Sequence, residues 1–386
     1  MKLEVELLSK ELIKPSSPTP ENLRHYQLSL LDQITPHGNS PAVYFFVPRY
    51  TPEFNLTRIS NRLKKSLSDV LTHYRPFAGR LIDEKFIDCN DEGVPYIETR
   101  VMSKLNDVLN NPVPSELNKL VPFEVEDVLD LTLGVQLNVF ECGGIAIGTS
   151  VSHRIADGMS TFVFAKNWVA ISRGQVDLVR TQGNRLESDE PQGFCALFHT
   201  VNLRSRMKPT LQEYSFGIYF GDALAIVSIS SRINSSEQVY HGLMRQLTEQ
   251  TKKFDKEYIN EIQEGGHEYL NILKEGLDRV LKGEIVSFEF GSLCWFPLYD
   301  ADFGWGKPIW VGLPAWPDEN MAMFVDTKSG GGIEAYVNLK VQDMAKFEND
   351  KELLAYSLTL QQCVTNETRT HDSPTPTFLH RPANQI

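Results

Sequence analysis

The sequence predicts an α/β fold, and three observations support this prediction. Residues 145–151 are a run of small and β-branched residues of strand length, and residues 159–172 then place apolar residues at helical spacing. The first half of the chain contains further strand candidates and one clear helix, without an internal repeat. The chain has 386 residues, of which 41% are hydrophobic and 23% charged, so it is long enough for two domains with large cores.

The elements of the first half follow from short local patterns. Residues 3–8 alternate charged and apolar side chains as a strand does, and residues 14–20 form a proline-rich connector. A helix is predicted over 59–74 and ends at a proline, after which a tight glycine turn leads into a strand. Further strands are predicted at 42–47, from 97 onward and at 131–140.

The second half begins with a segment that lacks the apolar periodicity of the first half. Residues 175–194 are polar and irregular, which predicts a linker or surface loop. A strand is predicted at 195–203, and helices are predicted at 236–254 and 258–282. Residues 288–306 are predicted to form a loop, because glycines permit unusual backbone shapes while the aromatic residues around them hold the loop by burial.

Charge and cysteine content exclude several classes of protein. A net charge of −12 argues against a general nucleic-acid or anionic-membrane binder, since both need spread positive charge. The five cysteines are scattered and lack paired zinc spacing, so we interpret them as reduced thiols of a cytoplasmic protein. The N-terminal residues lack the apolar core of a signal peptide, and no run is long enough to cross a membrane. We expect no nucleic-acid or membrane partner and no bound metal.

His153 and Asp157 lie where the predicted strand gives way to the helix, at a strand end where α/β folds tend to expose their chemistry. About one such pair is expected by chance among 9 histidines and 50 acidic residues, so its context decides. In one interpretation Asp157 caps the helix, which Gly158 and Ser160 favour, and His153 is an ordinary hydrogen-bonded residue. In the other, His153 takes a proton from a hydroxyl or amine. The two are compatible, because Asp157 can fix the turn that aims His153.

The densest basic cluster is found at residues 202–208 (Asn-Leu-Arg-Ser-Arg-Met-Lys). It is open to three interpretations: a solvated turn, a phosphate site or an internal ion pair. Arg204 and Arg206 suit the last two, because arginine offers a rigid fork of donors to carboxylate or phosphate.

Two motifs carry a resemblance to a known family. Residues 153–158 (His-Arg-Ile-Ala-Asp-Gly) and 302–306 (Asp-Phe-Gly-Trp-Gly) resemble the two signature motifs of the plant BAHD acyl-CoA-dependent acyltransferases, in the same order. Residues 74–81, 202–207 and 326–337 are similar to the same family, and 202–207 is most similar to its vinorine synthase-like, alkaloid-acetylating branch. Asp-Phe-Gly also occurs in protein kinases, but neither a Gly-rich loop nor a catalytic-loop motif accompanies it here.

The resemblance implies two similarly built, chloramphenicol acetyltransferase-like domains with mixed sheets flanked by helices and a channel between them. The N-terminal domain is expected at 1–175, a shortened crossover at 176–194 and the C-terminal domain at 195–356. Residues 357–386 are polar and unlike the family's ending, so a disordered tail is expected there. The family resemblance also predicts a monomer.

The resemblance implies an O-acyltransferase that acetylates a hydroxyl of an alkaloid or another plant specialised metabolite. Acyl-CoA, with acetyl-CoA as the expected donor, is then a co-substrate, and no cofactor is permanently bound. His153 is expected to be the general base, and Asp302 is named as a second catalytic residue because that position of the motif is sometimes assigned as a proton acceptor. Trp305 is a candidate for oxyanion support. The residues expected to support the site structurally are Asp157, Gly158, Arg204, Arg206, Gly304 and Gly306, with Asp157 paired to one of the two arginines.

One departure from the family keeps a second function open. His153 and Asp302 are 149 positions apart, several dozen fewer than the family usually has, and the shortening falls in 176–194. The alternative is therefore a catalytically inactive, truncated or mis-spliced relative that acts at most as a binding protein. A metal hydrolase is less favoured, because His153 and Asp157 have no third ligand at recognisable spacing.

Overall fold

The structure is a computed structural model of the chain. It describes residues 2–35, 37–48, 55–124, 130–175, 195–204, 206, 217–227, 236–264, 266–282, 285–316, 319–351, 359–361 and 377–382. The predicted crossover at 176–194 lies outside these described residues.

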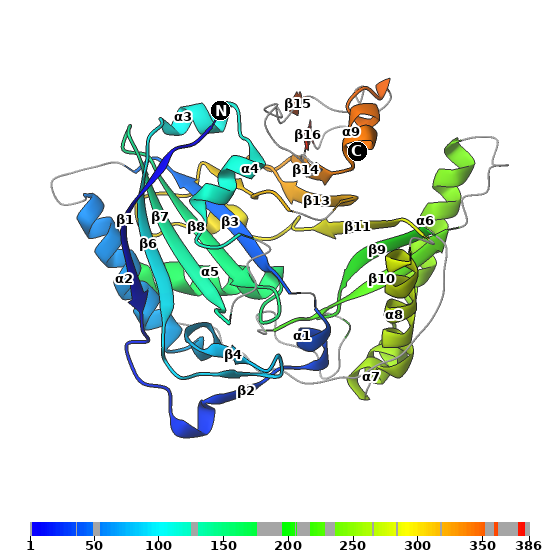
Figure 1. The fold of residues 1–386 in the computed structure, drawn as a ribbon, viewed down its shortest axis with the longest axis horizontal. Helices are drawn as coiled ribbons and strands as arrows, with labels where there is room; N and C mark the ends of the chain where they lie inside the picture. Colours follow the sequence, from blue (N-terminus) through cyan, green and yellow to red (C-terminus); the bar gives the residue numbers. More distant parts are fainter. Residues whose placement is uncertain are drawn as a thin grey trace.

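Within the described residues the backbone forms two large mixed sheets and a small third sheet (Figure 1). The first sheet has the order β1 (Val5–Ile13), β6 (Val94–Val101), β7 (Leu133–Phe140), β8 (Ile145–Ser152), β3 (Asn39–Phe46) and β12 (Trp310–Gly312). The second has the order β10 (Phe220–Val227), β9 (Cys195–Asn202), β11 (Ser287–Ser292), β13 (Met321–Asp326), β14 (Gly332–Asn338), β16 (Thr377–Pro382) and β15 (Thr359–Gln361). The small sheet joins β2 (His25–Gln27), β5 (Phe86–Asp88) and β4 (Arg80–Ile82).

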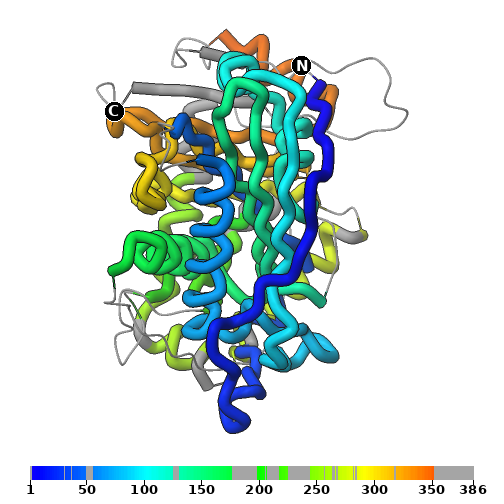
Figure 2. The backbone as a smooth tube through the Cα atoms, turned by 90° about the vertical axis from the view of Figure 1, so that its left-hand side faces the viewer, coloured from blue at the N-terminus to red at the C-terminus, as the bar shows by residue number. Residues whose placement is uncertain are grey.

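The helices flank these sheets, which confirms the predicted α/β class. They are α1 (Leu30–Ile34), α2 (Leu56–Leu71), α3 (Leu105–Asn110), α4 (Pro114–Leu117), α5 (Gly158–Ser172), α6 (Ser236–Lys253), α7 (Lys256–Glu264), α8 (His267–Leu281) and α9 (Val341–Phe347). Helices α2 and α5 pack against each other on one side of the first sheet, where Figure 2 shows them side by side. Helices α6 and α8 pack against β10. Across the described residues, every helix is too short or too polar to cross a membrane.

Helix α2 is capped at its N-terminus and buries one apolar face, as its sequence pattern predicts. Asn55 caps its N-terminus by accepting a hydrogen bond from the N–H of Arg58. Its apolar residues recur every three or four positions, so they form one stripe, and all of that stripe is buried: Ile59, Leu63, Leu67, Val70 and Leu71. Each such side chain contributes about 1.5–3 kcal/mol of hydrophobic stabilisation relative to exposure. This stripe meets the core face of α5, where Trp168 is buried.

The two halves of the chain are interlocked by β12. This short strand comes from the second half, yet it pairs antiparallel with β3 of the first sheet, and Trp310 lies opposite Phe45. The two rings stack with centroids 5.1 Å apart. The first sheet is therefore completed by residues that follow the predicted second-domain boundary at 195.

The structure corrects the predicted single helix over 258–282. The chain instead forms two helices, α7, which ends at Glu264, and α8, which begins at His267. Gly266 adopts the left-handed conformation (φ 60°) and stands directly before α8. A left-handed residue cannot continue a right-handed helix, and glycine takes this conformation at little steric cost. The sequence offered a signal for this break in the pair Gly265–Gly266, but the regular apolar face of residues 269–280 favoured a single helix.

Two further predictions are corrected in the second sheet. The loop predicted over 288–306 begins with a strand, β11, which pairs in parallel with both β9 and β13. The tail predicted to be disordered contributes β15 and β16, and β16 pairs antiparallel with β14 over six positions. Residues 377–379 are Thr-Phe-Leu, a short strand-forming run that the polar composition around it had outweighed.

Candidate active site

His153 directly follows β8 and is half-buried. Its backbone N–H donates a hydrogen bond of 2.9 Å to the carbonyl of Gly38, which fixes the chain where the strand ends. Its ring meets the ring of Phe220 at a centroid distance of 5.7 Å and an interplanar angle of 79°. Phe220 begins β10 of the second sheet, so the imidazole lies where the two halves of the chain meet.

The surroundings of His153 favour the neutral imidazole. Burial lowers its pKa below the ordinary value of 6.5. A hydrogen bond to the residue's own backbone and the nearby carboxylate of Asp157 act in the opposite direction, but burial outweighs both. A neutral imidazole at neutral pH has a free lone pair, so His153 is able to accept a proton.

Asp157 is buried and serves two purposes. It is the N-cap of α5, because its Oδ1 accepts a 2.9 Å hydrogen bond from the N–H of Ser160. It also forms a bidentate ion pair with Arg204, whose two terminal nitrogens lie 2.6 and 2.8 Å from Oδ2 and Oδ1. The Arg204 guanidinium also lies over the ring of Tyr219, 4.8 Å from its centroid. The turn that carries His153 is thus braced from the second half of the chain.

The basic cluster at 202–208 divides between two internal partners. Arg204 pairs with Asp157, whereas Arg206 donates to the backbone carbonyls of Thr251 and Phe254 at 2.9 and 3.1 Å. Those carbonyls lie at the C-terminal end of α6, where helices leave acceptors unsatisfied. Of the two arginines that the sequence offered to Asp157, the structure selects Arg204. The other members of the cluster at 205, 207 and 208 lie outside the described residues.

The Asp302 loop is held together by hydrogen bonds from its own backbone N–H groups to the side chain of Asp302. Oδ1 of Asp302 accepts hydrogen bonds from the N–H groups of Gly304 and Gly306 at 2.8 and 2.9 Å. Both glycines have positive φ, of 107° and 108°, which brings these N–H groups round to one carboxylate oxygen. Oδ2 lies 3.5 Å from the guanidinium of Arg173.

The same loop is fastened to the C-terminal end of α5. Oγ of Ser172 donates to the carbonyl of Phe303 at 3.0 Å, and Nε of Arg62 donates to the carbonyl of Ser172 at 2.7 Å. The Arg62 guanidinium lies so close to Gly304 that a Cβ there would stand 2.8 Å from its nitrogens. The space above Gly304 is therefore filled by an arginine of α2.

Asp302 and His153 are not brought together by this arrangement. Arg173, which contacts Asp302, follows the last residue of α5, whereas His153 precedes the first. The helix has 15 residues and is therefore about 22 Å long. The geometry does not support the expected catalytic role of Asp302 and instead makes its carboxylate the anchor of the loop.

Trp305 also lies away from His153. It is buried, its ring stacks on Phe303, and it meets Phe46 edge-on at a centroid distance of 6.2 Å. Phe46 pairs with Ile145 at the start of β8, and His153 follows the other end of that eight-residue strand. These ends are roughly 23 Å apart. The expected oxyanion role of Trp305 is therefore not supported by its position.

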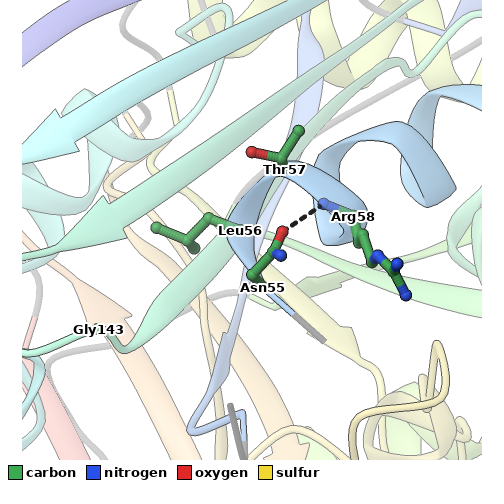
Figure 3. Close-up of a pocket in the computed structure, with 5 residues that line it drawn as sticks. All are labelled: Asn55, Leu56, Thr57, Arg58 and Gly143. Atoms are coloured by element: carbon green, nitrogen blue, oxygen red, sulfur yellow. Dashed lines mark hydrogen bonds between the residues drawn. The ribbon is translucent and has the colours of Figure 1, made fainter. Parts of the chain in front are cut away.

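A surface hollow at the start of α2 belongs to this distant end as well (Figure 3). It is lined by Asn55, Leu56, Thr57, Arg58 and Gly143. Gly143 lies two residues before the start of β8. The hollow is thus separated from His153 by the length of β8. Within the described ranges, no three His, Cys, Asp or Glu side chains lie close enough together to hold a metal ion.

The sequence analysis did not identify several residues that the structure places at the site. Phe220 lies in a strand that was not predicted, so nothing local connected it with His153. Asp32 is buried, and its carboxylate accepts the N–H of Ile218 from the second half at 3.2 Å. A signal for Asp32 existed, because Ser29 and Asp32 have the spacing of a capping box, in which each side chain bonds the other's backbone.

Comparison with known proteins adds a second line of evidence. The model of a family described as "Transferase family" matches residues 3–192 and 178–354. Limonoid 21-O-acetyltransferase of Melia azedarach is 31% identical over 453 aligned positions, which cover 98% of this chain and all of the relative. Stemmadenine O-acetyltransferase of Catharanthus roseus is 29% identical, with 90% of this chain and 97% of the relative covered. The crystal structure of vinorine synthase matches with a TM-score of 0.74 at 29% identity, over 89% of this chain and 96% of that one.

Proposed function

The chain belongs to the Transferase family, the BAHD acyl-CoA-dependent acyltransferases of plants, and we propose that it transfers an acyl group from acyl-CoA to a hydroxyl of a plant specialised metabolite. We take acetyl-CoA as the donor, because the two curated relatives described above are named as acetyltransferases. Those relatives are named for a limonoid and for an alkaloid, so the proposed acceptor is an alcohol of one of these two classes.

One observation carries the proposal: His153 has a lowered pKa and follows a strand end that Asp157 and Arg204 brace from both halves of the chain. In the proposed reaction the imidazole accepts the proton of the acceptor hydroxyl as its oxygen attacks the thioester carbonyl. A C–O bond forms and a tetrahedral oxyanion results. When the oxyanion collapses, the C–S bond breaks, and the CoA thiolate takes the proton back from the imidazolium.

The other motif residues take no chemical step in this proposal. Asp157 and Arg204 hold the turn that aims the imidazole, so they act on the reaction through His153. Asp302, Gly304 and Gly306 form a loop that is fastened to the C-terminal end of α5, where Arg62 of α2 also binds. A general base must be held rigidly in its orientation. The loop contributes to this by fixing the C-terminal end of α5, the helix that follows His153.

Binding of acetyl-CoA to the purified chain, measured by titration calorimetry alongside thermal melting, is the first test. An active acyltransferase should show saturable binding and a cooperative melt that shifts upward with ligand. Incubation with acetyl-CoA and a panel of limonoid and alkaloid alcohols should then yield an acetyl ester, detected by mass spectrometry. A folded chain that binds acetyl-CoA and makes no ester would favour the alternative, a relative that only binds. A chain that neither binds nor melts cooperatively would exclude both.

A further inference from the structure

A three-residue segment, 217–219, leads into the edge strand β10. The N–H of Leu203, just after β9, donates to the carbonyl of Tyr219 at 2.9 Å, and the other contacts of the segment described below come from outside its own sheet. The first residue of the segment is fixed by Ser160 of α5. Oγ of Ser160 accepts the N–H of Gly217 at 3.0 Å and donates to the carbonyl of the same residue at 2.8 Å. The second half of the chain is therefore attached, at this point, to the helix that follows His153.

The next two N–H groups of the segment are both received by buried carboxylates. Ile218 donates to Oδ1 of Asp32 at 3.2 Å, and Tyr219 donates to Oδ2 of Asp157 at 3.1 Å. Asp32 and Asp157 are each only 3% exposed. Two carboxylates from separate elements thus bind consecutive backbone N–H groups. Asp157 already has a role as the helix cap, whereas the reaction described above makes no use of Asp32.

The residue that follows this segment is Phe220, whose ring lies edge-on to the imidazole of His153. Because Phe220 is adjacent to Tyr219, the position of its ring depends on where the 217–219 segment is held. We propose that Asp32 is a positioning residue: by binding the N–H of Ile218 it fixes the 217–219 segment, and through it the ring of Phe220 against His153. The consequence for catalysis rests on the proposed acyltransferase function, whereas the structural consequence does not.

The location of Asp32 suits this task. It belongs to α1, which Figure 1 shows between the first sheet and the β9 and β10 strands of the second. Its neighbour Leu31 is buried in the cluster that contains Leu203, Ile218 and Tyr219 of the second half. The other oxygen of Asp32 accepts the N–H of Ser29 at 2.6 Å. One carboxylate therefore joins α1 to the strand entry of the opposite half.

Asp32 also has an unusual charge environment. Burial raises its pKa to about 7, the hydrogen bonds from Ser29 and Ile218 oppose the rise, and the carboxylate of Asp157 adds to it. The other ionisable groups that face it are the phenols of Tyr26 and Tyr219, and Arg204 lies beyond them, paired with Asp157. Protonation puts a hydrogen on one oxygen, which weakens the carboxyl as an acceptor of two N–H groups. The hold on the 217–219 segment should therefore loosen as the pH falls through about 7.

The test compares Asp32→Asn with Ser29→Ala, by NMR of protein labelled with ¹⁵N-histidine. Asparagine keeps the shape of Asp32 but can accept only one of its two N–H groups. Ser29→Ala removes the hydroxyl that caps α1 and leaves the contact with Ile218 in place, so it controls for damage to α1 alone. His153→Gln assigns the resonances of His153, and Phe220→Ala shows how they move when the neighbouring ring is lost.

We expect Asp32→Asn to move the His153 resonances in the direction that Phe220→Ala moves them, while Ser29→Ala leaves them at their wild-type positions. Resonances of His153 that are unchanged in Asp32→Asn would overturn the inference and leave Asp32 as a cap of α1. Should Asp32→Asn not fold, the wild-type protein decides: its His153 resonances should show an inflection near pH 7 besides their own titration. A single inflection would again overturn the inference.

Kinetics then test the consequence for catalysis. Asp32→Asn should lower kcat about tenfold or more, because misplacing the groups around a general base by a fraction of an ångström is costly, with KM for acetyl-CoA little changed. Ser29→Ala should leave both constants at wild-type values. An unchanged kcat in folded Asp32→Asn would contradict this consequence. If the wild-type chain transfers no acyl group at all, the proposed function fails, and the NMR comparison still decides the role of Asp32.

Discussion

Asp157 and Arg204 come from opposite halves of the chain and meet in a buried, bidentate ion pair, with N–O distances of 2.6 and 2.8 Å. The carboxylate that caps α5 is thereby tied to Arg204, which lies two positions after the end of β9. Since His153 lies four positions before Asp157, the orientation of the proposed base depends on a contact between the two halves.

Replacing Arg204 by Ala should be strongly destabilising. It leaves the Asp157 carboxylate buried without its counter-charge, which typically costs about 3–5 kcal/mol of unfolding free energy. Arg206→Ala is the matched control, because it removes two hydrogen bonds to backbone carbonyls and should cost only about 1–2 kcal/mol. Urea unfolding of both variants measures the difference. Equal losses of unfolding free energy would mean that the ion pair between Asp157 and Arg204 contributes no more to stability than the hydrogen bonds of Arg206.

The choice between these two arginines shows where sequence information ends. The cluster at 202–208 indicated an internal ion pair as one of three interpretations, and the His-x-x-x-Asp motif indicated the acid. Arg204 and Arg206 are chemically identical, however, and lie two positions apart. Which of them reaches Asp157 depends on where the end of α6 offers its carbonyls to Arg206, and that is a tertiary relationship.

Two glycine substitutions in the Asp302 loop separate backbone strain from crowding. Gly306→Ala places a Cβ in open space at φ 108°, so it should cost only the strain of that conformation, about 1–2 kcal/mol. Gly304→Ala has almost the same φ but also meets the Arg62 guanidinium at 2.8 Å, so its loss should be larger. Thermal unfolding checks the order. If Gly304→Ala were no more damaging than Gly306→Ala, crowding by the Arg62 guanidinium would carry no cost and the prediction would be wrong.

Asp302→Ala tests whether the loop takes part in the chemistry. The variant loses the two N–H contacts to Gly304 and Gly306 and should be destabilised by about 1–3 kcal/mol. Because Asp302 and His153 lie at opposite ends of α5, kcat at a temperature where the variant is folded should fall less than about tenfold. Steady-state kinetics provides the measurement. A loss as large as that of a His153 variant would restore Asp302 as a catalytic residue.

The Asp302 loop also shows the difference between a motif and its place in the fold. The five residues and their local hydrogen bonds are predictable, since a carboxylate followed by glycines two and four positions on can bind their N–H groups. The distance of the loop from His153 is not predictable in this way. It is set by the contacts of Arg173 and Ser172 with the loop at the far end of α5, which no short pattern encodes.

The strands of the second sheet were predicted least well, for a similar reason. The strands β7 and β8 and the helix α5 were predicted close to their observed positions, because their patterns are local and strong. Met321 of β13 lies opposite Glu289 of β11, and Thr377 of β16 lies opposite Val337 of β14, so these strands depend on partners more than 30 positions away in the sequence. Register and pairing decide such strands more than intrinsic preference does.

The lowered pKa of His153 predicts how activity and stability depend on pH. Because the pKa of His153 is lowered below 6.5, kcat/KM should fall only as the pH drops below 6.5, when the base becomes protonated. In the unfolded chain the histidine binds its proton near pH 6.5, before the folded state does, so its contribution makes stability fall as the pH drops below 6.5. A kcat/KM profile with an inflection above 6.5, unchanged in the Asp302→Ala variant, would contradict the assignment of His153 as a base with a lowered pKa.

The central claim is that His153 is the base of an acyl-CoA-dependent transfer, and one comparison tests it most directly. Wild-type protein and His153→Gln are incubated with acetyl-CoA and the alcohol acceptors, and both the acetyl ester and free CoA thiol are measured, with melting curves to show that each protein is folded. The wild type should form ester and thiol in equal amounts, and the variant should lose about a hundredfold or more in rate while it still binds acetyl-CoA. A folded His153→Gln variant that transfers acetyl at the wild-type rate would contradict the account.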